Sequence, residues 1–205
     1  MNNLEILCNF RGGKCMDDTK NLILDKAKER AEQYGFKKTT MDEISADCRI
    51  SKKTIYQHFE NKEDMFRSLV IRECKKATQM LFAQIESIAD PIEKLTQLIQ
   101  NAVSYFNQDH FISKVLKEYE MDWSLSDKSY REIIDEEVIS LIVNIIRDGK
   151  TKGAFRDVDE EITAYAGLKL FQSFTVARTG ILRQYTEPKS TGVLIDFILN
   201  GIIKH

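Results

Sequence analysis

Apolar residues recur at helical spacing along most of this chain, and short polar breaks separate the periodic stretches. Only 9 Gly and 2 Pro occur in 205 residues, which favours helices over strands joined by turns. The stretches that we interpret as helices are 20–34, 40–48, 51–59, 62 to the high 80s, 91–106, 130 to either 149 or 153, 159–184 and 189–203. The pattern therefore predicts an all-α fold.

Two segments depart from this periodicity. Residues 1–14 show no helical period and contain Gly12-Gly13, so we expect a disordered extension at 1–17 or a natural translation start at Met16. The alternative is a basic arm that reaches DNA through Arg11 and Lys14. Residues 109–127 are also irregular and are rich in aromatic side chains and Met.

The most specific local pattern lies in residues 39–62. Thr40 and Glu43 have the spacing of a capping box at a helix start. One apolar face of that short helix is formed by Met41, Ile44 and Cys48. Ser51 is suited to cap a second short helix after a tight turn. The segment therefore predicts a helix-turn-helix.

The second short helix has two chemically different sides. Ile55 and Phe59 stand four residues apart and are expected to pack inward. Lys53, Tyr56 and Gln57 then fall on the outward side. Cations, an aromatic hydroxyl and an amide are groups that contact phosphates and base edges in a DNA major groove.

The expected DNA contacts follow from side-chain chemistry. Lys53 can donate to guanine and Gln57 can pair with adenine. The other candidates are suited to phosphate contacts by hydroxyl group or charge: Thr40, Arg49, Ser51, Lys52, Thr54, Tyr56, His58 and Lys62. A partly packed surface histidine is the alternative for His58. A solvated helix face is the alternative for the whole cluster, and the capped two-helix pattern around it favours DNA.

This region resembles a known family. Gly35-Phe36, the run 40–44 and the run ISKKTIYQHFENKEDMF at 50–66 are similar to the N-terminal domain of TetR-family transcriptional regulators. The similarity covers about a quarter of the chain. It supports Thr40, Tyr56 and Lys62 as phosphate contacts.

The resemblance implies a two-domain organisation and a mode of action. After the extension 1–17, we expect a three-helix DNA-binding domain at 18–64 and a helical effector-binding and dimerisation domain at 65–205. Members of the family typically bind an inducer in the second domain, shift the long fourth helix and spread two DNA-binding heads. The expected partners are therefore double-stranded DNA with a palindromic operator, a small-molecule effector and a second copy of the chain. The expected outcome is repression.

One position departs from the family pattern. The turn between the two short helices is usually Ala-Gly in the family, and here it is Cys48-Arg49. A residue at that turn often needs a left-handed backbone, which costs Arg about 1 kcal/mol more than Gly. Contact between Arg49 and a phosphate is expected to offset this cost.

Composition excludes several classes of protein. The hydrophobic fraction is 42%, the charged fraction is 30% and the formal net charge is −2, as in an ordinary globular protein. The four cysteines lack metal-ligand or CxxC spacing, and no apolar run suits a membrane span or signal peptide. We expect no metal, no cofactor, no membrane partner and a cytoplasmic location.

Candidates for the effector pocket and the dimer interface come from the second domain. Aromatic residues between helices can line a pocket, although core packing is the alternative for each. The pocket candidates, with Arg178 as an anchor for an anionic ligand, are Phe106, Tyr119, Trp123, Phe171, Phe174 and Arg178. The last two helices are expected to form a four-helix bundle with a second copy, or to complete the core of one subunit. The interface candidates are Leu168, Ile181, Leu194, Phe197, Ile198 and Ile202.

The alternative function is a helical small-molecule binding protein or enzyme that has lost DNA recognition. The Arg49 departure and the nearly neutral charge are its support. No phosphate-binding loop, nucleophile elbow or HExxH motif occurs, so we expect no catalytic residues and no enzyme activity.

Overall fold

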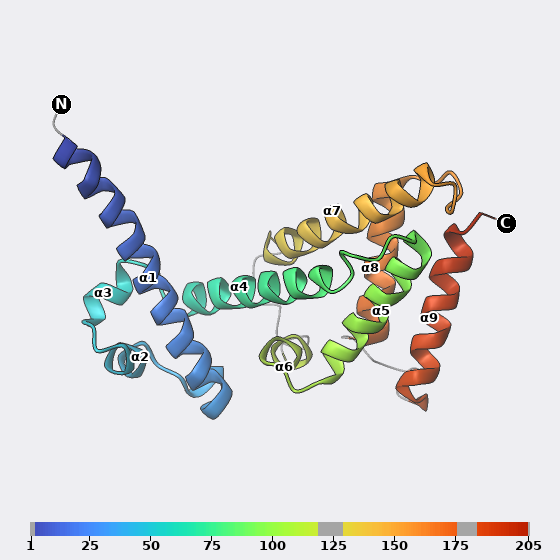
Figure 1. The fold of residues 1–205 in the computed structure, drawn as a ribbon. Coiled ribbons are helices and arrows are strands. Elements are labelled where there is room, and N and C mark those ends of the chain that lie inside the picture. The colour runs from blue at the N-terminus through green and yellow to red at the C-terminus, as the bar shows by residue number, and fades with distance from the viewer. Residues whose placement is uncertain (1–2, 119–128, 176–183, 205) are drawn as a thin grey trace. The chain divides into compact units, whose positions relative to one another are not determined.

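The computed structural model of the chain describes the backbone of residues 3–118, 129–175 and 184–204. Within these ranges the chain is helical, apart from turns and one isolated bridge between Phe155 and Ile203 (Figure 1). The chain divides into two compact units, Met1–Arg72 and Glu73–His205. The expected all-α fold is confirmed. No helix in the described part of the chain combines the length and apolarity that a membrane span requires.

The first unit contains three helices, a 3-10 turn and the start of a fourth helix. The elements are α1 (Asn3–Tyr34), η1 (Phe36–Lys38), α2 (Met41–Cys48), α3 (Lys52–Tyr56) and the N-terminal half of α4 (Lys62–Ala83). α1 packs against α2, and α2 packs against α3. Gly35 ends α1 with a positive φ of 81°, a conformation that is easy for glycine.

A small core holds these elements together. The buried side chains come from α1, α2, the segment around α3 and α4, and they include Ile23, Ile44, Ile55, Phe59 and Leu69. Each of these five is no more than 2% exposed. Apolar burial of this kind contributes about 1.5–3 kcal/mol per large side chain, so it fixes how the short helices lie on α1 and α4.

The second unit is a helical bundle. It comprises the C-terminal part of α4, α5 (Pro91–Asn107), α6 (Phe111–Glu118), α7 (Ser129–Thr151), α8 (Glu160–Thr175) and α9 (Glu187–Ile202). α5 contacts α7, α8 and α9, and α8 also contacts α7 and α9 (Figure 1). α5 therefore lies at the centre of the unit, and its buried face includes Leu95, Leu98, Ile99, Ala102 and Val103.

Near the end of α7, the ring of Phe155 packs directly against the helix backbone at Gly149. The ring of Phe155 is 2% exposed and packs directly against Gly149 in α7. A Cβ at Gly149 would lie 2.1 Å from Cδ2 of Phe155, which no side chain tolerates without movement. Arg156 follows and donates its backbone N–H to the carbonyl of Ile202 at 2.8 Å, which ties the α7–α8 connection to the end of α9.

Several boundaries differ from the sequence-based expectations. α1 begins at Asn3, so residues 3–17 are helical in the structure, where we expected a disordered extension. The segment contains Gly12-Gly13 but no proline, so every residue after the first turn can donate to the helical hydrogen-bond ladder. The first compact unit extends to Arg72, which pairs with Asp25 of α1 at 2.8 Å, whereas we expected the domain boundary at residue 64. α4 itself ends at Ala83, and part of the irregular stretch 109–127 forms α6.

The packing of Gly149 generates a stability prediction. Gly149→Ala should lower the free energy of unfolding by about 1–3 kcal/mol, because the new methyl group overlaps the Phe155 ring. Gly167→Ala is the matched control, because a Cβ at Gly167 in α8 meets nothing within 4 Å. That control should raise stability slightly through helix propensity. Thermal and denaturant unfolding measure both, and equal effects of the two substitutions would contradict the account.

Candidate nucleic-acid interface and small-molecule cavity

The start of α2 is fixed by a reciprocal cap. The Thr40 hydroxyl accepts from the backbone N–H of Glu43 at 3.3 Å, and the Thr40 backbone N–H donates to the Glu43 carboxylate at 2.9 Å. The expected capping box is therefore confirmed. Hydrogen bonds from Thr40, followed by the nearby charge of Arg30, hold the pKa of Glu43 below its ordinary value. The cap leaves Thr40 exposed at the N-terminal end of the helix.

Arg49 makes the turn between α2 and α3 in a left-handed backbone conformation, with φ 54° and ψ 38°. In the described part of the chain, Arg49 is the only residue other than glycine that has a positive φ. Its backbone N–H donates to Ala46, and that of Ile50 donates to Ser45, which satisfies carbonyls at the end of α2. The left-handed backbone that we expected at this turn is thus present, and the side chain of Arg49 is exposed.

α3 separates its two sides as the sequence predicts. Ser51 caps it by accepting from the backbone N–H of Thr54 at 3.1 Å. Ile55 is fully buried and Phe59, just beyond the helix, is 2% exposed. Lys53, Tyr56 and Gln57 are exposed on the opposite side, which leaves an amine, a phenol and an amide facing outward.

The other candidate DNA contacts surround this side, and some have partners within the chain. Lys52 forms an ion pair with Asp42 at 2.5 Å, and this hydrogen bond raises the pKa of the lysine. The Lys62 ammonium donates to the carbonyl of Lys37 and lies 4.3 Å from the centre of the Phe36 ring. The hydroxyls of Ser51 and Thr54 are hydrogen-bonded to each other at 2.8 Å. His58 is half-buried, with its ring centre 6.4 Å from that of Phe59.

Two arginines that the sequence analysis did not single out tie α1 to its neighbours. Arg30 makes a two-point contact with Asp47 and lies 3.2 Å from the Glu43 carboxylate, both in α2. The hydrogen bond with Arg30 lowers the pKa of Asp47. Arg72 on α4 pairs with Asp25 on α1 at 2.8 Å. These contacts hold the short helices in place, and only the folded structure shows them, since the partners are far apart in sequence.

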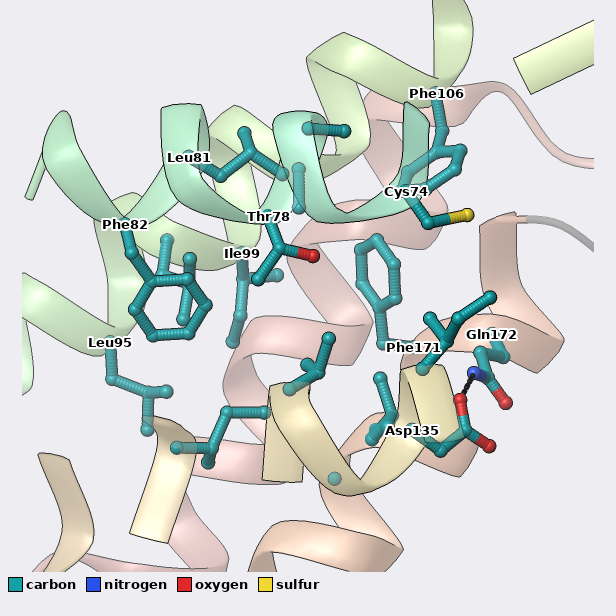
Figure 2. A pocket seen from close by; sticks show the side chains of 18 of the residues that line it. Cys74, Thr78, Leu81, Phe82, Leu95, Ile99, Phe106, Asp135, Phe171 and Gln172 are labelled. Carbon is teal, nitrogen blue, oxygen red and sulfur yellow. Dashed lines mark hydrogen bonds between the residues drawn. The ribbon is translucent and has the colours of Figure 1, made fainter. Parts of the chain in front are cut away.

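The second unit contains an apolar, partly open cavity of ≈ 160 Å³ (Figure 2). α4, α5, α7 and α8 supply most of its wall, mainly with aliphatic side chains. Leu81, Phe82 and Leu95 lie at one side of the view, and Asp135 and Gln172 lie at the other (Figure 2). The cavity therefore has an apolar end and a polar end.

The polar end is a three-residue network. Asp135 accepts from the Gln172 amide at 2.8 Å and from the Lys169 ammonium, and Lys169 also donates to the Gln172 carbonyl oxygen at 3.2 Å. Asp135 and Gln172 line the cavity. Neither residue is predicted as a pocket residue from the sequence; Asp135 begins an acidic run that is typical of a solvated helix face.

A buried thiol also faces the cavity. Cys74 on α4 is 6% exposed. Burial, with smaller effects of the Glu73 and Asp135 carboxylates, raises its pKa to about 12. Since a thiol with this pKa is neutral near pH 7, Cys74 acts there as a small apolar lining group.

The aromatic candidates for a pocket have different places. Phe106 and Phe171 both line the cavity, and their ring centres are 5.9 Å apart. Phe174 does not line this cavity. Its side chain packs against the core and lines a separate small crevice beside Val103. Tyr119, Trp123 and Arg178 lie outside the described residues.

The interface candidates differ in how far they are exposed. Leu168, Leu194 and Ile202 are 7%, 1% and 4% exposed within one subunit, which fits the alternative that these helix faces complete the core of one subunit. Ile198 is half-buried and lines the cavity. Phe197 is 65% exposed and remains available. Ile181 lies outside the described residues.

The left-handed turn generates a test. Arg49→Gly should be more stable than Arg49→Ala by about 1 kcal/mol, because only glycine adopts this backbone without a Cβ penalty. Both variants lose the same guanidinium group, so the difference between them isolates the backbone effect. Thermal unfolding measures it. Equal stability of the two variants would show that the turn is not strained.

The chain is similar in sequence to known bacterial regulatory proteins. The family model for bacterial regulatory proteins of the tetR family matches residues 23–69, which includes α2, α3 and the start of α4. The uncharacterized HTH-type transcriptional regulator YhgD of Bacillus subtilis strain 168 is 29% identical over 157 residues, covering 75% of this chain and 81% of that protein.

Two solved structures share the fold across nearly the whole chain. A regulator from Saccharomonospora viridis in complex with choline has a TM-score of 0.69 at 22% identity, covering 92% of this chain and 100% of that one. The regulator FadR from Bacillus subtilis in complex with stearoyl-CoA has a TM-score of 0.65 at 19% identity, covering 88% and 97%. The capped helix pair lies within the part of the chain that matches the tetR-family model, and YhgD and both solved structures are similar to the chain over most of its length; residues 23–69 therefore form a domain of the type found in bacterial regulatory proteins of the tetR family.

Proposed function

We propose that this protein is a sequence-specific DNA-binding repressor that a small-molecule ligand releases from a palindromic operator. The outward side of α3 carries the proposal: Lys53, Tyr56 and Gln57 are exposed on a helix that caps and buried residues hold in place. Arg49, Lys52, Lys53 and Lys62 surround it, against Glu60 as the acidic residue of the same stretch. This local excess of positive charge suits a phosphate backbone although the whole chain is nearly neutral.

The contacts divide into two kinds. Lys53 and Gln57 are assigned to base edges, where lysine donates to guanine and glutamine pairs with adenine. Phosphate contacts are assigned to Thr40, Arg49, Ser51, Lys52, Thr54, Tyr56, His58 and Lys62. The ion pair between Lys52 and Asp42 is exposed, so it is weak enough to exchange for a phosphate.

A homodimer is part of the proposal because one head is a small interface. Two heads on half-sites about 34–36 Å apart give a specific complex. Four large side chains on α8 and α9 are 53–69% exposed and supply an apolar surface for a second copy: Ile162, Tyr165, Val193 and Phe197. Such a surface on a monomer favours association. In this proposal, the exposed surface takes the place of the buried interface candidates Leu168, Leu194 and Ile202.

Ligand response is assigned to the cavity of the second unit. Five of its lining residues come from α4, the helix that begins in the first unit and ends in the second: Cys74, Ala77, Thr78, Leu81 and Phe82. A ligand that prefers one position of α4 would shift the population of DNA-binding conformations. The two structural neighbours hold choline and stearoyl-CoA, which share no head group, so the fold itself does not select the ligand.

A role as a transcriptional regulator also fits the expected lack of enzyme activity and the expected cytoplasmic location. Relatives of this chain are transcriptional regulators, which supports a non-enzymatic function. A bacterial regulator that binds chromosomal DNA works in the cytoplasm. The alternative, a helical binding protein that has lost DNA recognition, predicts no sequence preference at any salt concentration.

Removing the two base-reading side chains tests the assigned face. The double variant Lys53→Ala/Gln57→Ala should bind operator DNA at least about tenfold more weakly, since each base contact contributes about 1–3 kcal/mol. Lys204→Ala is the charge-matched control at an exposed position of the second unit and should bind like the unchanged protein. Fluorescence anisotropy at fixed salt measures affinity. Unchanged affinity of the folded double variant would refute the assignment.

Charge placed on the exposed apolar surface tests the dimer. Phe197→Asp should shift the protein to monomer, because a carboxylate cannot be buried between two copies without a partner. Met80→Asp is the control, since Met80 is 42% exposed on α4, away from α8 and α9 in sequence. Analytical ultracentrifugation gives the mass of each. A Phe197→Asp protein that remains dimeric would place the interface elsewhere.

A further inference from the structure

The cavity contains a feature that bears on the chemical class of its ligand, and the inference rests on the function proposed above. Among the lining residues that the structure describes, Asp135 is the charged one. The walls are otherwise aliphatic or aromatic, with polar groups limited to Cys74, Thr78 and Gln172. A carboxylate is costly in such surroundings unless a partner neutralises it, so its partner decides what the cavity can accept.

That partner is a lysine outside the cavity wall. The Lys169 ammonium contacts one carboxylate oxygen of Asp135 and the carbonyl oxygen of Gln172. The side chain of Lys169 is 39% exposed, whereas that of Asp135 is 13% exposed. Lys169 also lies with its ammonium 5.4 Å from the centre of the exposed Tyr165 ring. Asp135 and Gln172 thus belong to the cavity wall, and the cation that contacts them sits on the more exposed side chain of the ion pair.

This arrangement favours one charge of ligand. An ammonium group on a ligand can take the two acceptors that Lys169 occupies, the carboxylate of Asp135 and the carbonyl oxygen of Gln172. Lys169 loses little by turning into water, because partly exposed ion pairs are weak. A charge-assisted hydrogen bond inside the cavity is stronger than a neutral one.

A ligand carboxylate meets the opposite situation. It would lie beside the Asp135 carboxylate in an apolar cavity, and like charges at short distance disfavour each other strongly. Recruiting Lys169 to the ligand would leave Asp135 without its cation. The cavity therefore discriminates against a free fatty acid even though its walls suit an alkyl chain.

Cavity size limits the rest of the ligand. A cavity of ≈ 160 Å³ is close to the engineered cavity of about 150 Å³ that holds one benzene molecule, so about six to eight non-hydrogen atoms fit without movement of the walls. The apolar end near Leu81, Phe82 and Leu95 lies away from Asp135 and Gln172 (Figure 2). The dimensions suit a short apolar group with one polar head.

We propose that the effector is a small amphiphilic cation, with its ammonium group on Asp135 and Gln172 and its apolar part among the α4 and α5 side chains. Lys169 is the internal competitor, because its ammonium uses the same two acceptors when no ligand is present. The cavity rejects the carboxylate of the same chain length.

Three probes that differ only in their head group test this assignment at pH 7: n-hexylamine, 1-hexanol and hexanoate. Isothermal titration calorimetry on the full-length protein should give the tightest binding for the ammonium form of hexylamine, at least about tenfold tighter than hexanol. Hexanoate should bind most weakly. Stronger binding of hexanoate than of hexylamine, or binding of none of the three, would overturn the proposal.

Matched variants separate the head-group site from the apolar walls. Asp135→Asn should remove the preference for hexylamine over hexanol. Lys169→Met should strengthen hexylamine binding, because the internal competitor is gone while Asp135 remains. Ala102→Leu should weaken all three probes by filling the cavity from α5. Thermal unfolding checks that each variant is folded, and a preference for hexylamine that persists in folded Asp135→Asn refutes the role of Asp135.

A parallel DNA measurement keeps the two proposals distinguishable. Operator binding is followed by anisotropy with and without saturating hexylamine. If the head-group order is as predicted but DNA binding is absent or unaffected, the regulatory proposal fails and the cavity assignment stands. If a palindrome is bound specifically and the head-group order is reversed, the cavity assignment alone fails.

Discussion

Burial of Ile55 and Phe59 decides which side of α3 faces outward. Both side chains are removed from water in a core that also takes in Ile23, Ile44 and Leu69. Because α3 is only five residues long, it has little stability of its own and depends on this packing. The outward position of Lys53 and Gln57 is a consequence of that burial. The left-handed turn at Arg49 is maintained by the same packing, which over-determines a conformation that arginine alone disfavours.

The two short helices of the DNA-binding unit could be predicted from sequence because their determinants are local. The Thr40–Glu43 cap, the Ser51 cap and the four-residue spacing of Ile55 and Phe59 each act within one turn of helix. The structure confirms all three. The contacts of Arg30 with α2 could not be predicted, because they join residues that only the folded chain brings together.

The second unit was less predictable for the same reason. Its helices follow from periodicity, but the direction that each face takes depends on how several helices pack. Leu194 and Ile202 belong to an apolar face that a dimer or a core could use, and only packing against α5 decides for the core. The position of Asp135 also depends on packing. Its acidic neighbours in sequence predict a solvent-exposed helix face, yet in the folded chain Asp135 on α7 lines a cavity between α4, α5 and α8.

The two units are both helical but differ in where their polar and apolar groups lie. The first presents fixed polar groups outward from a small core, and the second keeps an apolar space inside a larger one. We expect the outward groups of the first unit to recognise a specific DNA sequence. Selection from a randomised duplex library at moderate salt, with purified folded protein free of ligand, would show this. The selected DNA should contain a palindrome whose half-sites lie about one helical turn apart or a multiple of it. Recovery of unrelated sequences with no shared motif would contradict it.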